Sequence, residues 1–173
     1  MTFVYHGVPE NMMGEEMLLL NQLRGANLSA YGKNIEKYKG REAVIERNVP
    51  LLNCKASDVI NLLPFNPKKL FEYQMELGLI SAAPSYAYFE IDLQLFNPKE
   101  TVVFFKTAPG EENVTIKWIK DVDFSELQEI PVATKQYYKS MVGKKEAVFN
   151  YRFVPHVLAR GPINIKNCDV IEI

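Results

Sequence analysis

The sequence contains very few residues of the types that mark several common classes of protein. It has two cysteines, Cys54 and Cys168, and two histidines, His6 and His156, among 173 residues. Two isolated cysteines are too few for a disulfide framework or a zinc site. We therefore expect two buried thiols in a reducing, cytoplasmic compartment, and no metal.

The chain also lacks an excess of charge of either sign and lacks long apolar runs. Lys and Arg number 20 and Asp and Glu number 21, so the net charge is -1. A chain of this balance does not bind nucleic acid through bulk basic charge, although a local basic groove remains open. No stretch approaches the roughly 20 apolar residues of a membrane-spanning helix, and the start lacks the pattern of a secretory signal. These absences predict a cytoplasmic protein without a membrane partner.

Several nucleotide-binding and catalytic motifs are missing as well. There is no Gly-rich phosphate loop and no Gly-x-Ser-x-Gly elbow. The length of 173 residues suits one domain, 1–173. A hydrophobic fraction of 47% is sufficient for a core that needs no disulfide bonds or metal ions to stabilise it. Because strands and helices do not alternate strictly, we expect no doubly wound sheet.

The hydrophobic pattern predicts an α+β fold, with a helical N-terminal block packed on a mixed, mainly antiparallel sheet. Period-two or short apolar runs predict strands, and apolar spacings of three and four predict helices. The expected strands are 3–5, 58–63, 86–91, 101–105, 114–119, 147–153, 156–160 and 169–173. The expected helices are 10–28, 30–38 with Ser29 as its cap, 66–77 and 131–141.

The stretch Thr2–Gly7 is the first candidate for function. It predicts a strand that ends in His6, and Gly7 allows a sharp turn or the close approach of a ligand. His156 follows Pro155 at the start of a later strand. If the terminal strands pair in one sheet, both imidazoles open onto one cleft and suit acid–base work. A structural role for each histidine is the alternative.

A basic segment between residues 37 and 41 is the second candidate. Lys39 and Arg41 flank Gly40, and Tyr38 lies between Lys37 and Lys39. Such cations can hold a phosphate or carboxylate, and a solvated helix face is the other interpretation.

Three short motifs resemble those of a known family. Tyr5-His6-Gly7 resembles the first motif of the ADP-ribosyltransferase-like fold. The runs 154–163 and 169–173 resemble the last motif of the DNA-modifying ADP-ribosyltransferase toxins, and 89–95 resembles their middle strand and turn. The chain also resembles small uncharacterised proteins of Bacillus and their phages.

The resemblance implies NAD as cofactor and a set of site residues. Tyr5, His6 and Gly7 would contact the ribose and nicotinamide side, and Lys39 or Arg41 would hold a phosphate. His156 stands where the family has its catalytic acid. A carboxylate there stabilises positive charge on the ribose, which an imidazole does poorly. The acid could otherwise be Asp169 or Glu172.

Three functional hypotheses follow. The first is an ADP-ribosyltransferase-like domain that binds NAD or a related nucleotide, active or degenerate, with a protein or nucleic-acid target if it is a bacterial transferase. The second is a non-catalytic interaction module of phage or mobile-element origin that binds a host protein or a nucleotide signal. The third, an RNA-end-processing enzyme, needs more basic residues in the cleft. A deep polar cleft that holds both histidines favours the first, and a flat apolar patch favours the second.

Overall fold

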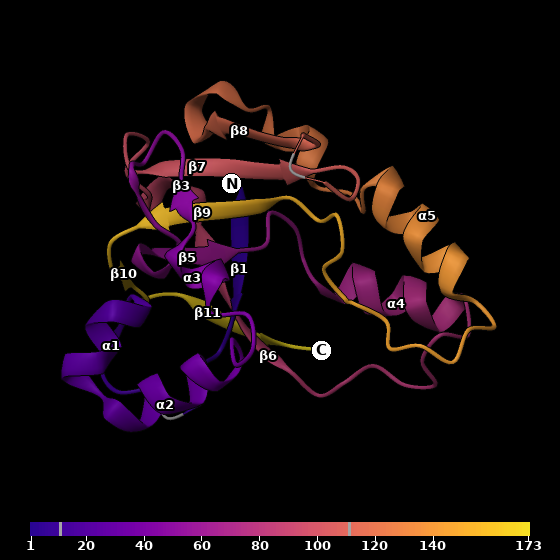
Figure 1. Ribbon diagram of the computed structural model, residues 1–173, viewed down its shortest axis with the longest axis horizontal. Helices are drawn as coiled ribbons and strands as arrows, with labels where there is room; N and C mark the ends of the chain where they lie inside the picture. The colour runs from indigo at the N-terminus through magenta and orange to yellow at the C-terminus, as the bar shows by residue number, and fades with distance from the viewer. Residues whose placement is uncertain (11, 111) are drawn as a thin grey trace.

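The structure, a computed structural model, describes residues 1–10, 12–110 and 112–173 (Figure 1). The strands are β1 (Phe3–Gly7), β2 (Glu16–Met17), β3 (Asn48–Val49), β4 (Cys54–Lys55), β5 (Val59–Leu62), β6 (Ala87–Asp92), β7 (Thr101–Lys106), β8 (Val114–Trp118), β9 (His156–Arg160), β10 (Ile163–Asn164) and β11 (Asp169–Glu172). The α-helices are α1 (Leu20–Ala26), α2 (Leu28–Glu36), α3 (Ala43–Glu46), α4 (Lys68–Glu76) and α5 (Val132–Met141). Short 3-10 turns are η1 (Ala56–Asp58), η2 (Leu93–Leu95), η3 (Ile119–Asp121) and η4 (Phe124–Leu127).

Two antiparallel sheets form the centre of the molecule. One has the order β1-β6-β11 and the other β5-β9-β7-β8. They are joined where Tyr5 and Leu63 each donate a backbone N–H to the other's carbonyl oxygen, at 2.8 Å in both directions. β1 and β11 therefore share a sheet, as expected for the terminal strands, because both pair with β6. β9 lies in the other sheet, which differs from the expectation.

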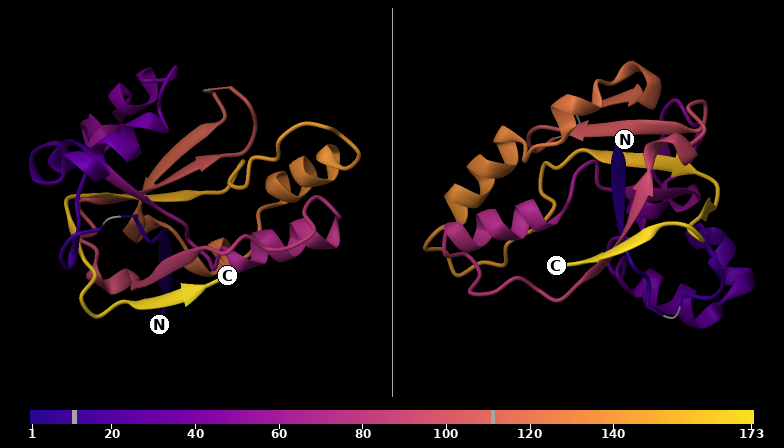
Figure 2. Two further views of the ribbon diagram at one scale, coloured as in Figure 1. Left: turned by 90° about the horizontal axis from the view of Figure 1, so that it is seen from below. Right: turned by 180° about the vertical axis from the view of Figure 1, so that it is seen from behind.

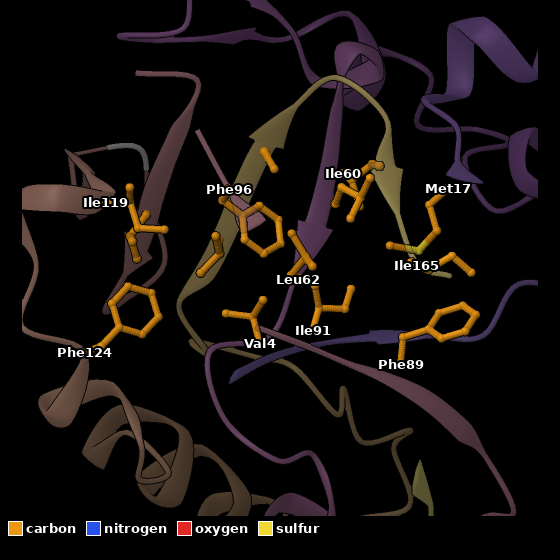
Figure 3. Packing of buried hydrophobic residues seen from close by; sticks show 14 of the residues in the cluster. Val4, Met17, Ile60, Leu62, Phe89, Ile91, Phe96, Ile119, Phe124 and Ile165 are labelled. Carbon is orange, nitrogen blue, oxygen red and sulfur yellow. The ribbon is translucent and has the colours of Figure 1, made fainter. Parts of the chain in front are cut away.

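The main core lies between the two sheets. Val4 and Ile91 come from the first sheet, and Leu62 and Val157 come from the second; each is almost fully buried. Figure 3 shows Val4, Ile91 and Leu62 pointing toward one another from different strands. Burying a side chain of this size contributes about 1.5–3 kcal/mol, so this layer is the main source of stability.

Two further clusters cover the remaining faces. Tyr5 and Tyr88, on the other face of the first sheet, pack with Leu70 of α4 and Tyr138 of α5. The outer face of the four-stranded sheet is covered by the segment around β3 and β4. The α1–α2 hairpin and the α4–α5 pair lie at opposite ends of the molecule (Figures 1 and 2).

The expected helix over 10–28 is wrong for most of its length. Asn11 lies outside the described residues. Gly14 has a φ of 78°, which interrupts a right-handed helix, and Met17 pairs with Ile163 in a short ladder between β2 and β10. Met17 is buried in the core and Met12 packs against it, whereas Met13 is exposed, and helix α1 begins only at Leu20.

The second expected helix begins earlier than Ser29. Asn27 caps α2, because its Oδ1 accepts a hydrogen bond from the Ala30 N–H at 3.0 Å. An Asn side chain satisfies this role as well as Ser does, and both residues lie near the same boundary in the sequence.

The expected strand over 147–153 is also wrong. This segment forms turns, in which the Arg152 N–H donates to the Phe149 carbonyl at 3.2 Å, and Phe153 has a φ of 61°. Its aromatic residues surround the Arg152 guanidinium, which lies 5.1 Å from the centroid of the Phe153 ring. The aromatic residues of this segment therefore pack against a cation instead of pairing in a sheet.

The α+β class and the antiparallel sheets agree with the sequence-based expectation. Every strand pairing within the described ranges is antiparallel. None of the described helices has the length and apolar character needed to cross a membrane.

Candidate functional site

A hollow that we call the His6 hollow lies between β1, β5 and the α1–α2 hairpin. Its volume is about 320 Å³, at the lower end of the range for small-molecule sites. Methionine and leucine side chains supply much of its apolar wall, and the polar groups at its surface are His6, Glu10, Glu16, Asn27, Asn34, Lys37, Tyr38 and Asn61. A small number of polar groups in an apolar hollow is the usual composition of a ligand site.

His6 is held in one tautomer. It lies two residues beyond Val4 on β1, so its side chain shares the face that looks toward the other sheet. Its Nδ1 lies 2.7 Å from the Gly7 carbonyl oxygen, and a carbonyl can only accept, so Nδ1 carries the proton. Nε2 of the neutral ring is then a hydrogen-bond acceptor.

The charge state of His6 follows from its surroundings. Burial lowers the pKa of His6 below its ordinary value, and the positive charge of Lys37 lowers it further, although the bond to Gly7 acts in the other direction. His6 is therefore neutral at pH 7. The hollow combines this neutral acceptor with a nearby ammonium group.

Lys37 reaches the hollow from the end of α2. Its Nζ donates to Asn34 Oδ1 at 3.2 Å. One turn earlier, Lys33 forms an exposed ion pair with Glu10, at 2.7 Å, at the rim. Exposed pairs contribute little to stability, so both ammonium groups remain available to an anionic ligand at small cost.

His156 lies in a second hollow, which we call the His156 hollow, of about 310 Å³. It is lined by Phe104, Lys106, Pro109, Gly110, Tyr151, Arg152, Phe153, Val154 and His156. His156 Nδ1 is buried and has no hydrogen-bond partner among the described residues. Burial lowers the pKa of His156 to about 4, so this imidazole is also neutral at pH 7.

The two histidines face opposite sides of the strands, so the structure does not bring them into one cleft. Val157 points into the core between the sheets, and its neighbour His156 therefore points to the outer face, beside Phe104 on β7. His6, in contrast, shares the inner face with Val4. The strand ends lie near each other, but the two-residue period of the strands separates the imidazoles.

Tyr5 and Gly7 take structural positions. Tyr5 is buried, and its hydroxyl donates to Glu90 Oε1 at 2.7 Å across the β1–β6 pair. Burial and the neighbouring Glu90 raise the pKa of Tyr5 well above its ordinary value. Gly7 orients the His6 ring through its carbonyl. Neither residue lines the His6 or the His156 hollow.

The predicted cations Lys39 and Arg41 also lie outside both hollows. Arg41 donates from Nε and Nη2 to the Lys37 carbonyl, at 3.1 and 2.8 Å, and so binds the end of α2. Lys39 is exposed. Within the basic segment 37–41, Lys37 and Tyr38 line the His6 hollow.

Other polar residues of the site were missed in the sequence. Asn34 and Lys37 lie three residues apart on α2, and Asn61 lies on β5. The spacing of Asn34 and Lys37 gave a signal, since such residues share a helix face. Asn61 gave none. The alternative acids Asp169 and Glu172 lie on β11 and line neither hollow.

The fold corresponds to a known class of structure. No family model matches the sequence, and no curated protein sequence matches it. The chain has a DarTG-like α+β fold. A solved structure with a similar fold is "Thermosipho africanus DarTG in complex with ADP-ribose", which superposes on this chain with a TM-score of 0.52 and 10% sequence identity. The match covers 98% of this chain and 43% of that chain, and at this identity it shows the fold alone.

Proposed function

We propose that this protein binds ADP-ribose or a related nucleotide such as NAD in the His6 hollow. The observation that carries the proposal is the fixed His6 tautomer, with Nδ1–H bound to the Gly7 carbonyl and Nε2 left as an acceptor. A ribose hydroxyl is a donor that suits this atom. The DarTG structure, which shares the fold, was solved with ADP-ribose, and the sequence resemblance points to the same ligand class.

The hollow is lined by one ammonium group, that of Lys37, and by the carboxylates of Glu10 and Glu16, so the lysines are the groups that would bind a ligand's phosphates. Lys37 lines the hollow, and Lys33 lies one turn away at the rim. A diphosphate would gain from both ammonium groups, and the exposed Glu10 can leave Lys33 at little cost. Tyr38 adds a ring beside Lys37, against which a base could stack.

This function is ligand binding, and His156 has no role in it as a catalyst of ADP-ribosyl transfer. A neutral imidazole does not stabilise positive charge on a ribose, and His156 faces the side opposite to His6. The histidine at the position of the family's acid therefore favours the degenerate form of the fold over an active transferase.

A second candidate function is the non-catalytic interaction module. Apolar side chains of α5 and the turn that follows it are exposed: Val132 is 69% accessible, Val142 50% and Phe149 60%. Large exposed apolar side chains favour a partner protein where they form one continuous patch. This function is compatible with nucleotide binding at the His6 hollow, which lies at the other end of the molecule.

Thermal unfolding with ADP-ribose, NAD and AMP tests the proposal. A ligand at about 100 times its Kd stabilises a folded chain by about 2.7 kcal/mol, which raises the Tm by roughly 5–10 °C at this size. We expect ADP-ribose to raise the Tm, and expect His6→Ala and Lys37→Ala to reduce its affinity about tenfold or more.

Matched variants make the test specific. Lys145→Ala removes an exposed ammonium that lines neither hollow, and it should leave the affinity unchanged. Arg41→Ala tests whether the sequence-based phosphate contact exists, because a direct contact would also cost about tenfold. Absence of a Tm shift with every nucleotide would overturn the proposed function. An NAD-consumption assay on wild type and His156→Glu separates the degenerate from the active form.

A further inference from the structure

The His156 hollow contains two cations that form no ion pair with a carboxylate in the described ranges. Lys106 and Arg152 both line it, and neither forms an ion pair with any described carboxylate. Both side chains are half-buried, so their charges are less well solvated than those of surface lysines. A positive charge held in a hollow without a counter-charge is a feature that an anion can complement.

The sheet brings these groups to one place. Phe104 on β7 lies directly opposite His156 on β9, and Lys106 follows Phe104 by two residues, so the three share one face. Arg152 comes from the turn before β9 and lies at the side of the same hollow. The positions are therefore fixed by the strand register and not by flexible termini.

The Arg152 guanidinium packs among three aromatic rings. Its guanidinium carbon lies 5.1 Å from the centroid of the Phe153 ring, 5.6 Å from that of Tyr137 and 5.9 Å from that of Phe149. The guanidinium has a planar fork of N–H donors, and this fork matches two oxygens of a carboxylate or phosphate.

His156 contributes a third polar group. Its Nδ1 is buried, and the Pro155 backbone acts on the ring against the larger effect of burial, raising its pKa where burial lowers it. Nε2 is the other ring nitrogen, and with the proton there the neutral ring can donate to an anion in the hollow. The carboxylate of Glu112 lies against Gly110 at the rim, where it accepts a hydrogen bond from Asn113 Nδ2 at 3.2 Å.

We propose that the His156 hollow binds the anionic group, phosphate or carboxylate, of a small organic molecule. Arg152 and Lys106 supply charged donors, His156 Nε2–H supplies a neutral one, and the ring of Phe104 packs against the apolar part of the ligand. This site is separate from the proposed nucleotide site, because the two hollows share no lining residue and face opposite sides of the strands.

Histidine-selective NMR tests the proposal, since the chain has only two histidines to assign. Phenyl phosphate, benzoate, inorganic phosphate and the neutral benzamide are titrated in turn. We expect saturable shifts of the His156 ring signals with phenyl phosphate or benzoate, and no comparable shift with benzamide. The signals of His6 should stay in place. The order of affinities among the three anions tells phosphate from carboxylate recognition.

Substitution of the cations gives the second part of the test. Lys106→Gln should raise the Kd of the tighter anion about tenfold or more, whereas Lys99→Gln, an exposed lysine on the turn before β7, should leave it unchanged. Lys106 is preferred to Arg152, because Arg152 packs against three rings and its loss could unfold the turn. Equal Kd values for the two lysine variants, or His156 shifts of equal size with benzamide, would overturn the proposal. ADP-ribose binding at His6 is measured separately, so either proposal can fail alone.

Discussion

At the scale of the residue, the two imidazoles differ in what fixes them. The Gly7 carbonyl fixes the tautomer of His6, whereas Nδ1 of His156 is buried without a comparable hydrogen bond among the described residues. Burial lowers the pKa of both rings. Two neutral imidazoles suit hydrogen bonding to a ligand better than they suit stabilisation of a cation.

The lowered pKa of His156 makes stability depend on pH. The folded ring has a pKa of about 4, and the unfolded ring has the ordinary value of about 6.5. The unfolded state therefore binds more protons between these values, and the free energy of unfolding falls as the pH drops from about 6.5 to about 4. The contribution is at most about 3 kcal/mol, fully present above pH 6.5.

The measurement is urea unfolding of wild type and His156→Gln at pH 7.5, 6, 5 and 4. The wild type should lose up to about 3 kcal/mol more than the variant over this range, since His6 and the carboxylates are common to both. Identical pH dependence of the two proteins would show that the folded imidazole titrates near its ordinary pKa.

At the scale of the element, the segment before α1 shows how one residue ends a predicted helix. Residues 12–17 have the apolar spacing of a helix, but Gly14 has a φ of 78° and Met17 pairs in β2. In this conformation an L-residue is strained, whereas in a helix glycine is the residue that costs stability.

The sign of a substitution at Gly14 distinguishes the two conformations. Gly14→Ala should lower the free energy of unfolding by about 1 kcal/mol, because alanine does not tolerate the left-handed backbone. Gly32→Ala is the matched control: Gly32 lies inside α2, and a methyl group added there would meet nothing within 4 Å, so alanine should raise stability by up to about 1 kcal/mol. Chemical denaturation measures both, and stabilisation by Gly14→Ala would return residues 10–19 to the helical interpretation.

At the scale of the whole molecule, the layer between the sheets determines stability and positions both hollows. Leu62 is 1% exposed and faces Val4 and Ile91 across the layer, while the next residue, Leu63, joins the sheets through Tyr5. A cavity at Leu62 should therefore destabilise the packing of both sheets.

Leu62→Ala should cost about 2–5 kcal/mol, from lost transfer energy and the cavity left behind. Leu95→Ala, at a leucine 63% exposed on η2, should change stability by no more than about 0.5 kcal/mol. Guanidinium unfolding of the two variants provides the comparison. A small effect at Leu62 would mean that the layer can collapse around the missing methyl groups.

The sequence by itself determined the α+β class and most strands. Val4, Val102 and Val103 are apolar residues at strand spacings, and burial preference alone places them inside. Helix α4 was predictable in the same way, because Pro67 and Gly78 mark its two ends. In these segments the local pattern and the long-range contacts favour the same conformation.

Tertiary structure alone decided the rest, above all the placement of the two histidines. The sequence predicted strand ends at His6 and His156, but a shift of register by one residue moves a side chain to the opposite face. The bridge from Tyr5 to Leu63 and the pairing of Phe104 with His156 fix that register. These contacts join residues far apart in the chain, so no local pattern contains them. They separate the imidazoles into two hollows.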